Sequence, residues 1–262
     1  MEIIQFDISG KFAHFRKYYA NNTAMTFSIP PRTTLMGVLA AIVGLPKDSY
    51  YEALASDKIR IGVAVKTPIK KSFHRLNLLS IKSKGDFKKS FESDFRGMNG
   101  RIQTPFEIVS GHNIQTDEVC YRVFVSYFDA GKSWFDELKI RLEQKNPHFQ
   151  LTLGTAQFLA AISNYTVFTT SKAETAQEDW VEFDSAVISE KVSELDFKRG
   201  SLQHFVEEEL LPADFKANFD RELSKMNRVL FTTGNIPLRV RYTGTTYTIS
   251  TETETQTIQF LE

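Results

Sequence analysis

The first 65 residues contain a helical segment, and a second short helix expected over residues 48–55, between two segments in which apolar and polar side chains alternate. Residues 3–9 and residues 59–65 both show the two-residue period of a strand with one buried face. The apolar segment between them, residues 33–43, follows two prolines and ends before Gly44, which are start and stop signals for a helix. A strand–helix–strand order of this kind restricts the chain to folds in which helices pack against a sheet.

A second unit of the same kind begins near residue 120. Residues 120–128 are typical of a buried strand, residues 133–144 of an amphipathic helix, and residues 149–168 of an apolar turn, a short helix and a further strand. Two such units predict the α+β fold class, with a ferredoxin-like, RRM-like core in which antiparallel strands carry helices on one side. We assign residues 1–170 to this core.

A strongly basic segment separates the two units. Between residues 60 and 101 there are 11 lysines and arginines and 3 acids, a net charge of +8. We predict that residues 69–104 leave the core as a protruding hairpin or long loop, here called the basic thumb. Such a segment can be a solvated loop or a surface for a polyanion, and its length and one-sided charge favour the polyanion.

The last third of the chain has the opposite charge. Residues 172–222 contain 6 basic and 14 acidic residues, a net charge of −8. We predict that residues 171–262 form an acidic connector, a helical stretch around residues 202–211, and a small β-rich C-terminal subdomain with turns at its glycines. The acidic face would avoid nucleic acid or meet a basic protein.

Composition narrows the classes of function. Basic and acidic residues balance at 32 each, so the charge pattern matters more than the total. Cys120 is the single cysteine, which excludes an internal disulfide and a cysteine zinc site and fits the reducing cytoplasm. The longest apolar stretch, residues 37–45, is shorter than the roughly 20 residues of a membrane span. We expect a soluble cytoplasmic protein without a metal or other cofactor, because no histidine stands at metal-ligand spacing.

The sharpest local signal is a loop that interleaves aromatic and basic residues. It contains His14, Phe15, Arg16, Lys17 and Tyr18. Aromatic rings stack on bases while lysine and arginine pair with phosphates, so such a mixture suits a single nucleic-acid strand. The alternative is that Phe15 and Tyr18 belong to the core and the cations solvate a loop.

The basic thumb repeats this signal at Phe73, His74 and Arg75, which we also predict to contact nucleic acid. Like the loop, this short run is a candidate on its residue types alone.

The segment SGKFAHFRKYYANNTAMTFSIPPRTTLMGVLAAIVGLP, residues 9–46, closely resembles the N-terminal signature of the Cas-five proteins, CRISPR-associated subunits of Cascade surveillance complexes in the RAMP superfamily. RIQTPFEIV with YRVFV is similar to the segment where the family's thumb returns to the core. LTLGTAQFLAAI is similar to the family's glycine turn. Among the branches of the family, the sequence as a whole is most similar to type I-B.

The resemblance implies a non-catalytic subunit that caps the complex and holds the five-prime handle of the CRISPR RNA. It implies contacts with Cas-seven-type backbone subunits and a Cas-eight-type large subunit, near the PAM of target DNA. The RNA-binding residues implied by the matched motifs and by the basic–aromatic pattern are His14, Phe15, Arg16, Lys17, Arg32, Lys70, Lys71, Phe73, His74, Arg75, Arg101, Gln103, Gly154 and Thr155. Arg32 would orient the Pro-Pro loop or reach a phosphate, and Gly154 and Thr155 would let the backbone approach RNA.

The alternative function is a metal-independent endoribonuclease that processes precursor CRISPR RNA, as one branch of the family does with a tyrosine and an adjacent Lys-His pair. This sequence has no Lys-His dipeptide. His74 or His112 would have to act with Tyr18, Tyr19 or Tyr50 as acid and base. We therefore expect no catalytic residues.

Overall fold

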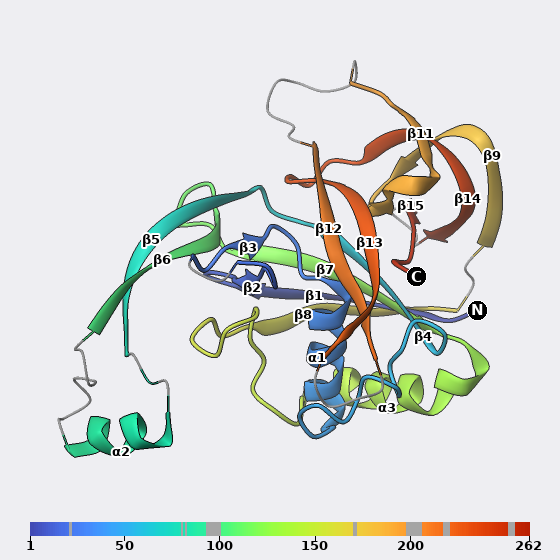
Figure 1. The fold of residues 1–262 in the computed structure, drawn as a ribbon. Helices are drawn as coiled ribbons and strands as arrows, with labels where there is room; N and C mark the ends of the chain where they lie inside the picture. Colours follow the sequence, from blue (N-terminus) through green and yellow to red (C-terminus); the bar gives the residue numbers. More distant parts are fainter. Residues whose placement is uncertain are drawn as a thin grey trace.

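The computed structural model describes residues 1–20, 23–79, 81, 83–92, 101–169, 172–197, 206–216, 221–250 and 255–262. It combines a four-stranded sheet, two packed helices, a long hairpin and a set of C-terminal strands (Figure 1). This mixed architecture with mostly antiparallel strands confirms the predicted combination of helices and strands.

The central sheet contains the four strands that were predicted from alternating or continuous apolar residues. Its strands are β1 (Ile3–Gly10), β4 (Ile59–Val65), β7 (Val119–Tyr127) and β8 (Ala161–Phe168). The order across the sheet is β4-β7-β1-β8, and every neighbouring pair is antiparallel. β1 and β7 therefore lie in the middle, where their residues are mostly buried.

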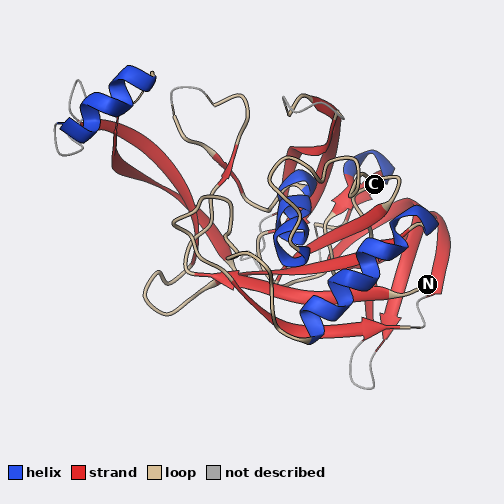
Figure 2. Ribbon diagram, turned by 90° about the horizontal axis from the view of Figure 1, so that it is seen from below, coloured by secondary structure: helices blue, strands red, loops and turns tan. Residues whose placement is uncertain are grey.

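Two helices cover one face of this sheet (Figure 2). α1 (Arg32–Val43) lies between β1 and β4 in the chain, and α3 (Lys132–Glu143) follows β7 and the 3₁₀ turn Asp129–Gly131. α1 ends at Gly44, which has φ = +90° and donates its N–H to the Ala40 carbonyl. A left-handed glycine is the usual helix terminus, so the predicted end of this helix is confirmed.

The two faces of the sheet belong to different hydrophobic clusters. On one face, Phe6 and Val123 pack with α1, α3 and Leu211. On the other face, Phe124 packs with Ile258 and other C-terminal residues. Residues on both sides of position 170 therefore share these two clusters, while a third, around Phe183 and Tyr242, contains only C-terminal residues.

A long hairpin extends from the core between β4 and β7. It consists of β5 (Ile69–Leu79), α2 (Lys84–Glu92) and β6 (Arg101–Gly111), and β5 pairs with β6 along its whole length. Figure 1 shows it curving away from the sheet with α2 at its far end. The other edge of β6 meets the loop that follows β1 through bridges at Ala13 and Ala24. Of the two forms expected for this segment, a hairpin or a long loop, its described residues adopt the hairpin.

The loop after β1 contains its own small ribbon, in which β2 (Phe15–Arg16) pairs with β3 (Thr26–Phe27). Ala13 pairs with Val109 of β6, and the His14 N–H donates to the Leu153 carbonyl. The loop is therefore held at both sides by the core.

The C-terminal third is built from strands. These are β9 (Lys172–Phe183), β10 (Val187–Ile188), β11 (Val192–Leu195), β12 (Val206–Phe215), β13 (Leu223–Thr232), β14 (Leu238–Ser250) and β15 (Thr255–Ile258), with a 3₁₀ turn at Ser189–Lys191. The β-rich character agrees with the sequence prediction.

Two local predictions for this third differ from the structure. The helix expected around residues 202–211 is wrong for residues 206–211, which belong to β12, while residues 202–205 lie outside the described part. β9 occupies the place expected for a connector. Glutamate and leucine favour helix in isolation, but β12 pairs with β13 over ten residues, and tertiary pairing overrides intrinsic propensity.

Among the described residues, no helix is long and apolar enough to cross a membrane.

Candidate nucleic-acid interface

The β5–β6 hairpin carries an aromatic side chain between two basic ones. Lys71, Phe73 and Arg75 are alternate residues of β5, so their side chains lie on the same face of the hairpin. Phe73 is 57% exposed, and Arg75 is exposed as well. Gln103, opposite Asn77 in β6, adds an exposed amide. A ring between cations matches the repeat of bases and phosphates in a single nucleic-acid strand.

Several cations of the hairpin have no carboxylate partner. Within the described residues, Lys70, Arg75, Lys84 and Lys88 are exposed and form no ion pair. The Lys70 ammonium donates to the His112 carbonyl at 2.7 Å and keeps its charge for other partners. The unpaired cations give the hairpin the electrostatic character of a polyanion-binding surface.

Two more of the predicted residues lie on the hairpin. His74 is exposed, with its Nε2 atom 3.0 Å from the Ser72 hydroxyl. Arg101 begins β6 opposite Leu79, and its side chain lies outside the described part of the structure.

The loop after β1 exposes only part of its predicted binding set. Arg16 is exposed, and its Nη2 atom donates to the Ala20 carbonyl at 2.9 Å. Tyr18 and Tyr19 are 52% and 55% exposed, with ring centroids 5.1 Å apart in an edge-to-face contact. Tyr18 therefore does not belong to the core, unlike the alternative considered from the sequence. These rings and Arg16 offer stacking and phosphate contacts beside the hairpin.

His14 and Phe15 are core residues, which corrects the prediction that their side chains contact RNA. His14 is 1% exposed, stacks on Phe106 with centroids 4.0 Å apart, and donates from Nδ1 to the Glu107 carbonyl at 2.7 Å. Phe15 is 2% exposed and packs edge-on against Tyr121. The loop residues next to β6 are drawn into the core because the backbone at Ala13 pairs with that strand.

The buried His14 predicts a pH-dependent stability. Burial lowers the pKa of His14 below its ordinary 6.5, so the unfolded chain binds a proton more readily than the folded protein. The free energy of unfolding is therefore highest above pH 6.5 and falls as the pH decreases toward the folded pKa. We expect His14→Gln to flatten this dependence in urea unfolding compared at about pH 7.5 and about pH 5. His112→Gln, which changes an exposed histidine, should keep the wild-type slope; equal slopes in wild type and His14→Gln would contradict the prediction.

Lys17 and Lys71 are paired with two glutamates of β12, Glu207 and Glu209, here called the acidic pair. Lys17 Nζ lies 3.0 Å from Glu209, and Lys71 Nζ lies 3.3 Å from both glutamates. Glu209 also accepts the Ser28 N–H at 2.9 Å. Burial opposes the charge of Lys17, but the contact with Glu209 outweighs it and raises the pKa of Lys17. These lysines join the loop and the hairpin to the C-terminal strands.

Arg32 is a buried structural residue, which corrects the prediction that it could reach a phosphate. It is 1% exposed, and its Nη1 atom lies 2.6 Å from Asp214 Oδ1. Its Nη2 atom donates to the carbonyls of Leu54 and Ile59 at 3.0 and 2.6 Å. The guanidinium therefore connects the start of α1 to β4 and β12 inside the protein.

Gly154 lets two segments of this protein approach each other. It has φ = +95°, and a Cβ atom at this position would lie 1.9 Å from the His14 carbonyl oxygen. The close approach expected at this glycine is therefore made first of all to the protein's own loop. The neighbouring Thr155 is partly exposed, and its buried hydroxyl has no partner within the described residues.

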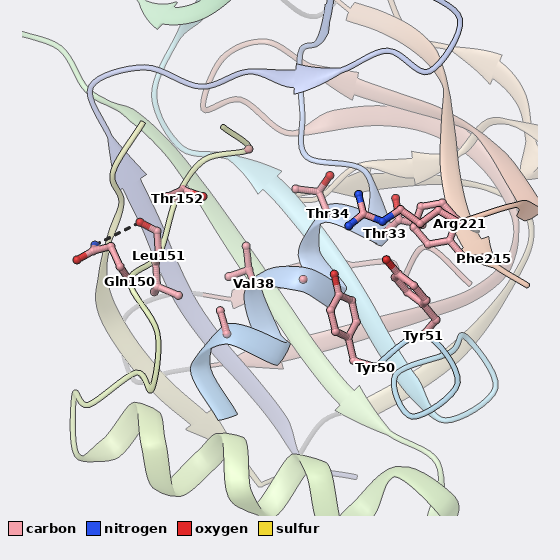
Figure 3. A pocket seen from close by; sticks show the side chains of 13 residues that line it. Thr33, Thr34, Val38, Tyr50, Tyr51, Gln150, Leu151, Thr152, Phe215 and Arg221 are labelled. Atoms are coloured by element: carbon pink, nitrogen blue, oxygen red, sulfur yellow. Dashed lines mark hydrogen bonds between the residues drawn. The ribbon is translucent and has the colours of Figure 1, made fainter. Parts of the chain in front are cut away.

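A cavity of about 350 Å³ opens beside the N-terminal end of α1 (Figure 3). Polar groups reach it from α1, from the segment after α1, from the loop before β8 and from the segment just before β13; they belong to Thr33, Thr34, Tyr50, Tyr51, Gln150 and Arg221. Of these residues, sequence reasoning named only Tyr50, as one candidate for catalysis. The fold brings the other residues together from segments that are distant in the sequence. The one sequence feature that could have indicated the cavity is the presence of threonines at the start of the predicted helix 33–43 and of tyrosines after its end.

The described residues contain no group of three or more histidine, cysteine or carboxylate side chains arranged to hold a metal ion.

The antiparallel sheet, the basic hairpin and the exposed part of the loop define an α+β protein with an extended basic surface. The chain belongs to the Cas-five (Cas5) family of CRISPR-associated proteins, because the family model described as CRISPR-associated protein (Cas_Cas5) matches residues 3–229. No curated protein matches the sequence.

Two solved structures are similar to this chain. A crystal structure described as that of a CRISPR protein from Archaeoglobus fulgidus is similar, with a TM-score of 0.54 and 13% identity over 99% of both chains. A chain of a CRISPR RNA-guided surveillance complex gives a TM-score of 0.48 and 14% identity over 91% of this chain and 90% of that one. At these identities the similarity concerns the fold.

Proposed function

We propose that this chain is the non-catalytic CRISPR-RNA-binding subunit of a type I Cascade complex, of the I-B branch, and that it holds the five-prime handle of the guide RNA. Membership in the Cas5 family supports a place in a CRISPR effector complex. The observation that carries the RNA-binding role is the exposed Phe73 between basic residues on a hairpin with unpaired cations.

The proposed binding mode follows from the exposed groups. A phosphate of the handle pairs with Arg75, and one base stacks on Phe73, which lies on the same face of β5. Tyr18 and Tyr19 continue the stacking surface on the neighbouring loop. The core acts as the rigid support of both, and its strand order, with a helix after the first and third strands, supports the ferredoxin-like assignment.

The proposed partners follow from the family. Cas-seven-type backbone subunits contact the hairpin, which acts as the thumb, and a Cas-eight-type large subunit packs beside this chain near the PAM of target DNA. The complex works in the cytoplasm. The lysines held by the acidic pair keep the loop and thumb in one orientation for these contacts.

Binding of handle RNA tests the proposal. We expect the purified chain to bind repeat-derived RNA with its native handle at least about tenfold more tightly than RNA with a scrambled handle, a difference of about 1.4 kcal/mol. Fluorescence anisotropy with labelled RNA measures both affinities. Equal binding of the two RNAs would reject the handle-specific role.

The same RNA separates binding from catalysis. Incubation with EDTA should leave the repeat RNA intact, because the proposed role needs no cleavage. Specific cleavage that His74→Ala or His112→Ala abolishes would instead identify an endoribonuclease.

A further inference from the structure

The cavity beside α1 has one aromatic wall. The rings of Tyr50, Tyr51 and Phe215 follow one another in edge-to-face contacts, with centroids 4.8 and 4.9 Å apart. Figure 3 shows the hydroxyl ends of both tyrosines directed toward Thr34 and Arg221. A volume of about 350 Å³, lined by both aromatic and polar groups, is large enough for a small ligand.

Arg221 is held at the rim of this cavity by one carboxylate oxygen. Its Nε and Nη2 atoms lie 2.8 and 2.7 Å from Asp48 Oδ1, which also accepts the Tyr51 hydroxyl. A guanidinium has five N–H donors, so Nη1 keeps donors without a described partner. Arg221 can therefore bind a phosphate while Asp48 still holds it in place.

The backbone at both ends of this ion pair is strained. Arg221 has φ = +54° and Asp48 has φ = +64°, in the left-handed region that L residues rarely adopt. A partly exposed ion pair contributes little stability, so the pair does not by itself account for two such residues. Strained backbone that positions a charged side chain at a cavity is characteristic of ligand-binding sites.

The start of α1, beside Arg221 (Figure 3), also favours an anion. α1 begins after Pro31 without a side-chain cap, and Thr33 and Thr34 of its first turn line the cavity. The N-terminal end of a helix attracts negative charge. The N-terminal end of α1 and Arg221 together form a place for a phosphate group in this cavity. Tyr50 offers a surface for a ring of the same ligand.

We propose that this cavity is a single-nucleotide pocket, in which the base lies against Tyr50 and the phosphate binds Arg221 and Thr34. The inference deepens the proposed function, since a guide RNA would supply the nucleotide by turning one base out of its stack. A free nucleotide has the same chemistry, so the two sources are separated by experiment.

Nucleoside monophosphates test the pocket directly. Saturation-transfer NMR of the full chain with AMP, GMP, CMP or UMP should detect at least one of them. We expect Arg221→Gln to weaken this binding at least about fivefold, because the phosphate loses a charge-assisted partner. Asp48→Asn keeps the acceptor oxygen and removes a negative charge, so it should strengthen binding about twofold. Ala41→Phe, which fills the lined space from α1, should abolish it.

Matched controls separate ligand contacts from structural effects. Arg228→Gln changes another exposed arginine, and Ala130→Phe adds a ring at an exposed alanine outside the cavity; both should bind as wild type. If the Asp48–Arg221 pair were only structural, Arg221→Gln and Asp48→Asn would both lower the free energy of unfolding. Nucleotide binding would then not weaken in the first variant and strengthen in the second. That result, or the absence of binding by all four nucleotides, would overturn the proposal.

Handle RNA with one abasic position at a time identifies the source. Guide RNA is the source if one abasic position weakens binding to wild type at least about fivefold and has no effect on Ala41→Phe. A free nucleotide is the source if a monophosphate binds and handle RNA does not displace it. Because the NMR measurement needs no RNA, failure of the handle-specific role leaves this test intact.

Discussion

Replacement of Arg32 by methionine is expected to lower the free energy of unfolding by about 3–5 kcal/mol, because it leaves the Asp214 carboxylate buried without its cation. The Arg32 guanidinium is 1% exposed and lies 2.6 Å from Asp214. The substitution also leaves the carbonyls of Leu54 and Ile59 without a donor. Urea unfolding followed by circular dichroism measures the loss.

Two further variants make this result specific. Arg32→Lys keeps the charge but cannot make the same set of contacts, so its loss should be smaller. Lys132→Met removes an exposed ion pair with Asp136 and should leave the free energy of unfolding close to that of the wild type. A loss below about 1 kcal/mol for Arg32→Met would contradict the buried-pair argument. RNA affinity per folded molecule should be unchanged in Arg32→Lys, since the side chain does not reach the surface.

The part of the fold that could be predicted is the part set by local patterns. The alternating residues of β1 and β4 predict strands, and the glycine-terminated apolar segment of α1 predicts a helix. In each case the prediction needs only residues that are close together in the sequence. β12 has no such signal. Its glutamates and leucines favour a helix, and it becomes a strand because β13 pairs with it and the acidic pair meets Lys17 and Lys71.

The residues of the candidate interface also fall into those whose exposure could be predicted from the sequence and those whose burial could not. Phe73 and Arg75 lie on a long hairpin, where alternation keeps them on one face and few residues can cover them. Arg32 and His14 resemble surface residues in the sequence because their neighbours are polar or basic. Their burial depends on Asp214 and Glu107, which are distant in the chain, so no local pattern indicates it.

The exposed ring of Phe73 provides the second large effect. Phe73→Ala should weaken handle binding by about 1–3 kcal/mol, about 5- to 150-fold, because a base loses its stacking partner. The slope of log affinity against log salt should stay unchanged, since no charge is lost. Phe73→Tyr, which keeps a ring at the same place, should restore most of the affinity. Anisotropy titrations across a salt series measure both quantities.

Arg75 should show the converse behaviour on the same face of the hairpin. Arg75→Gln removes one phosphate contact and should flatten the salt slope by about 0.7, with Arg228→Gln as the control that leaves it unchanged. Lys71→Gln should flatten the slope less than Arg75→Gln does, because Glu207 and Glu209 already neutralise Lys71. Equal changes for Lys71 and Arg75 would mean that RNA displaces the acidic pair, and no change for Arg75 or Phe73 would remove this face of the hairpin from the RNA-binding surface.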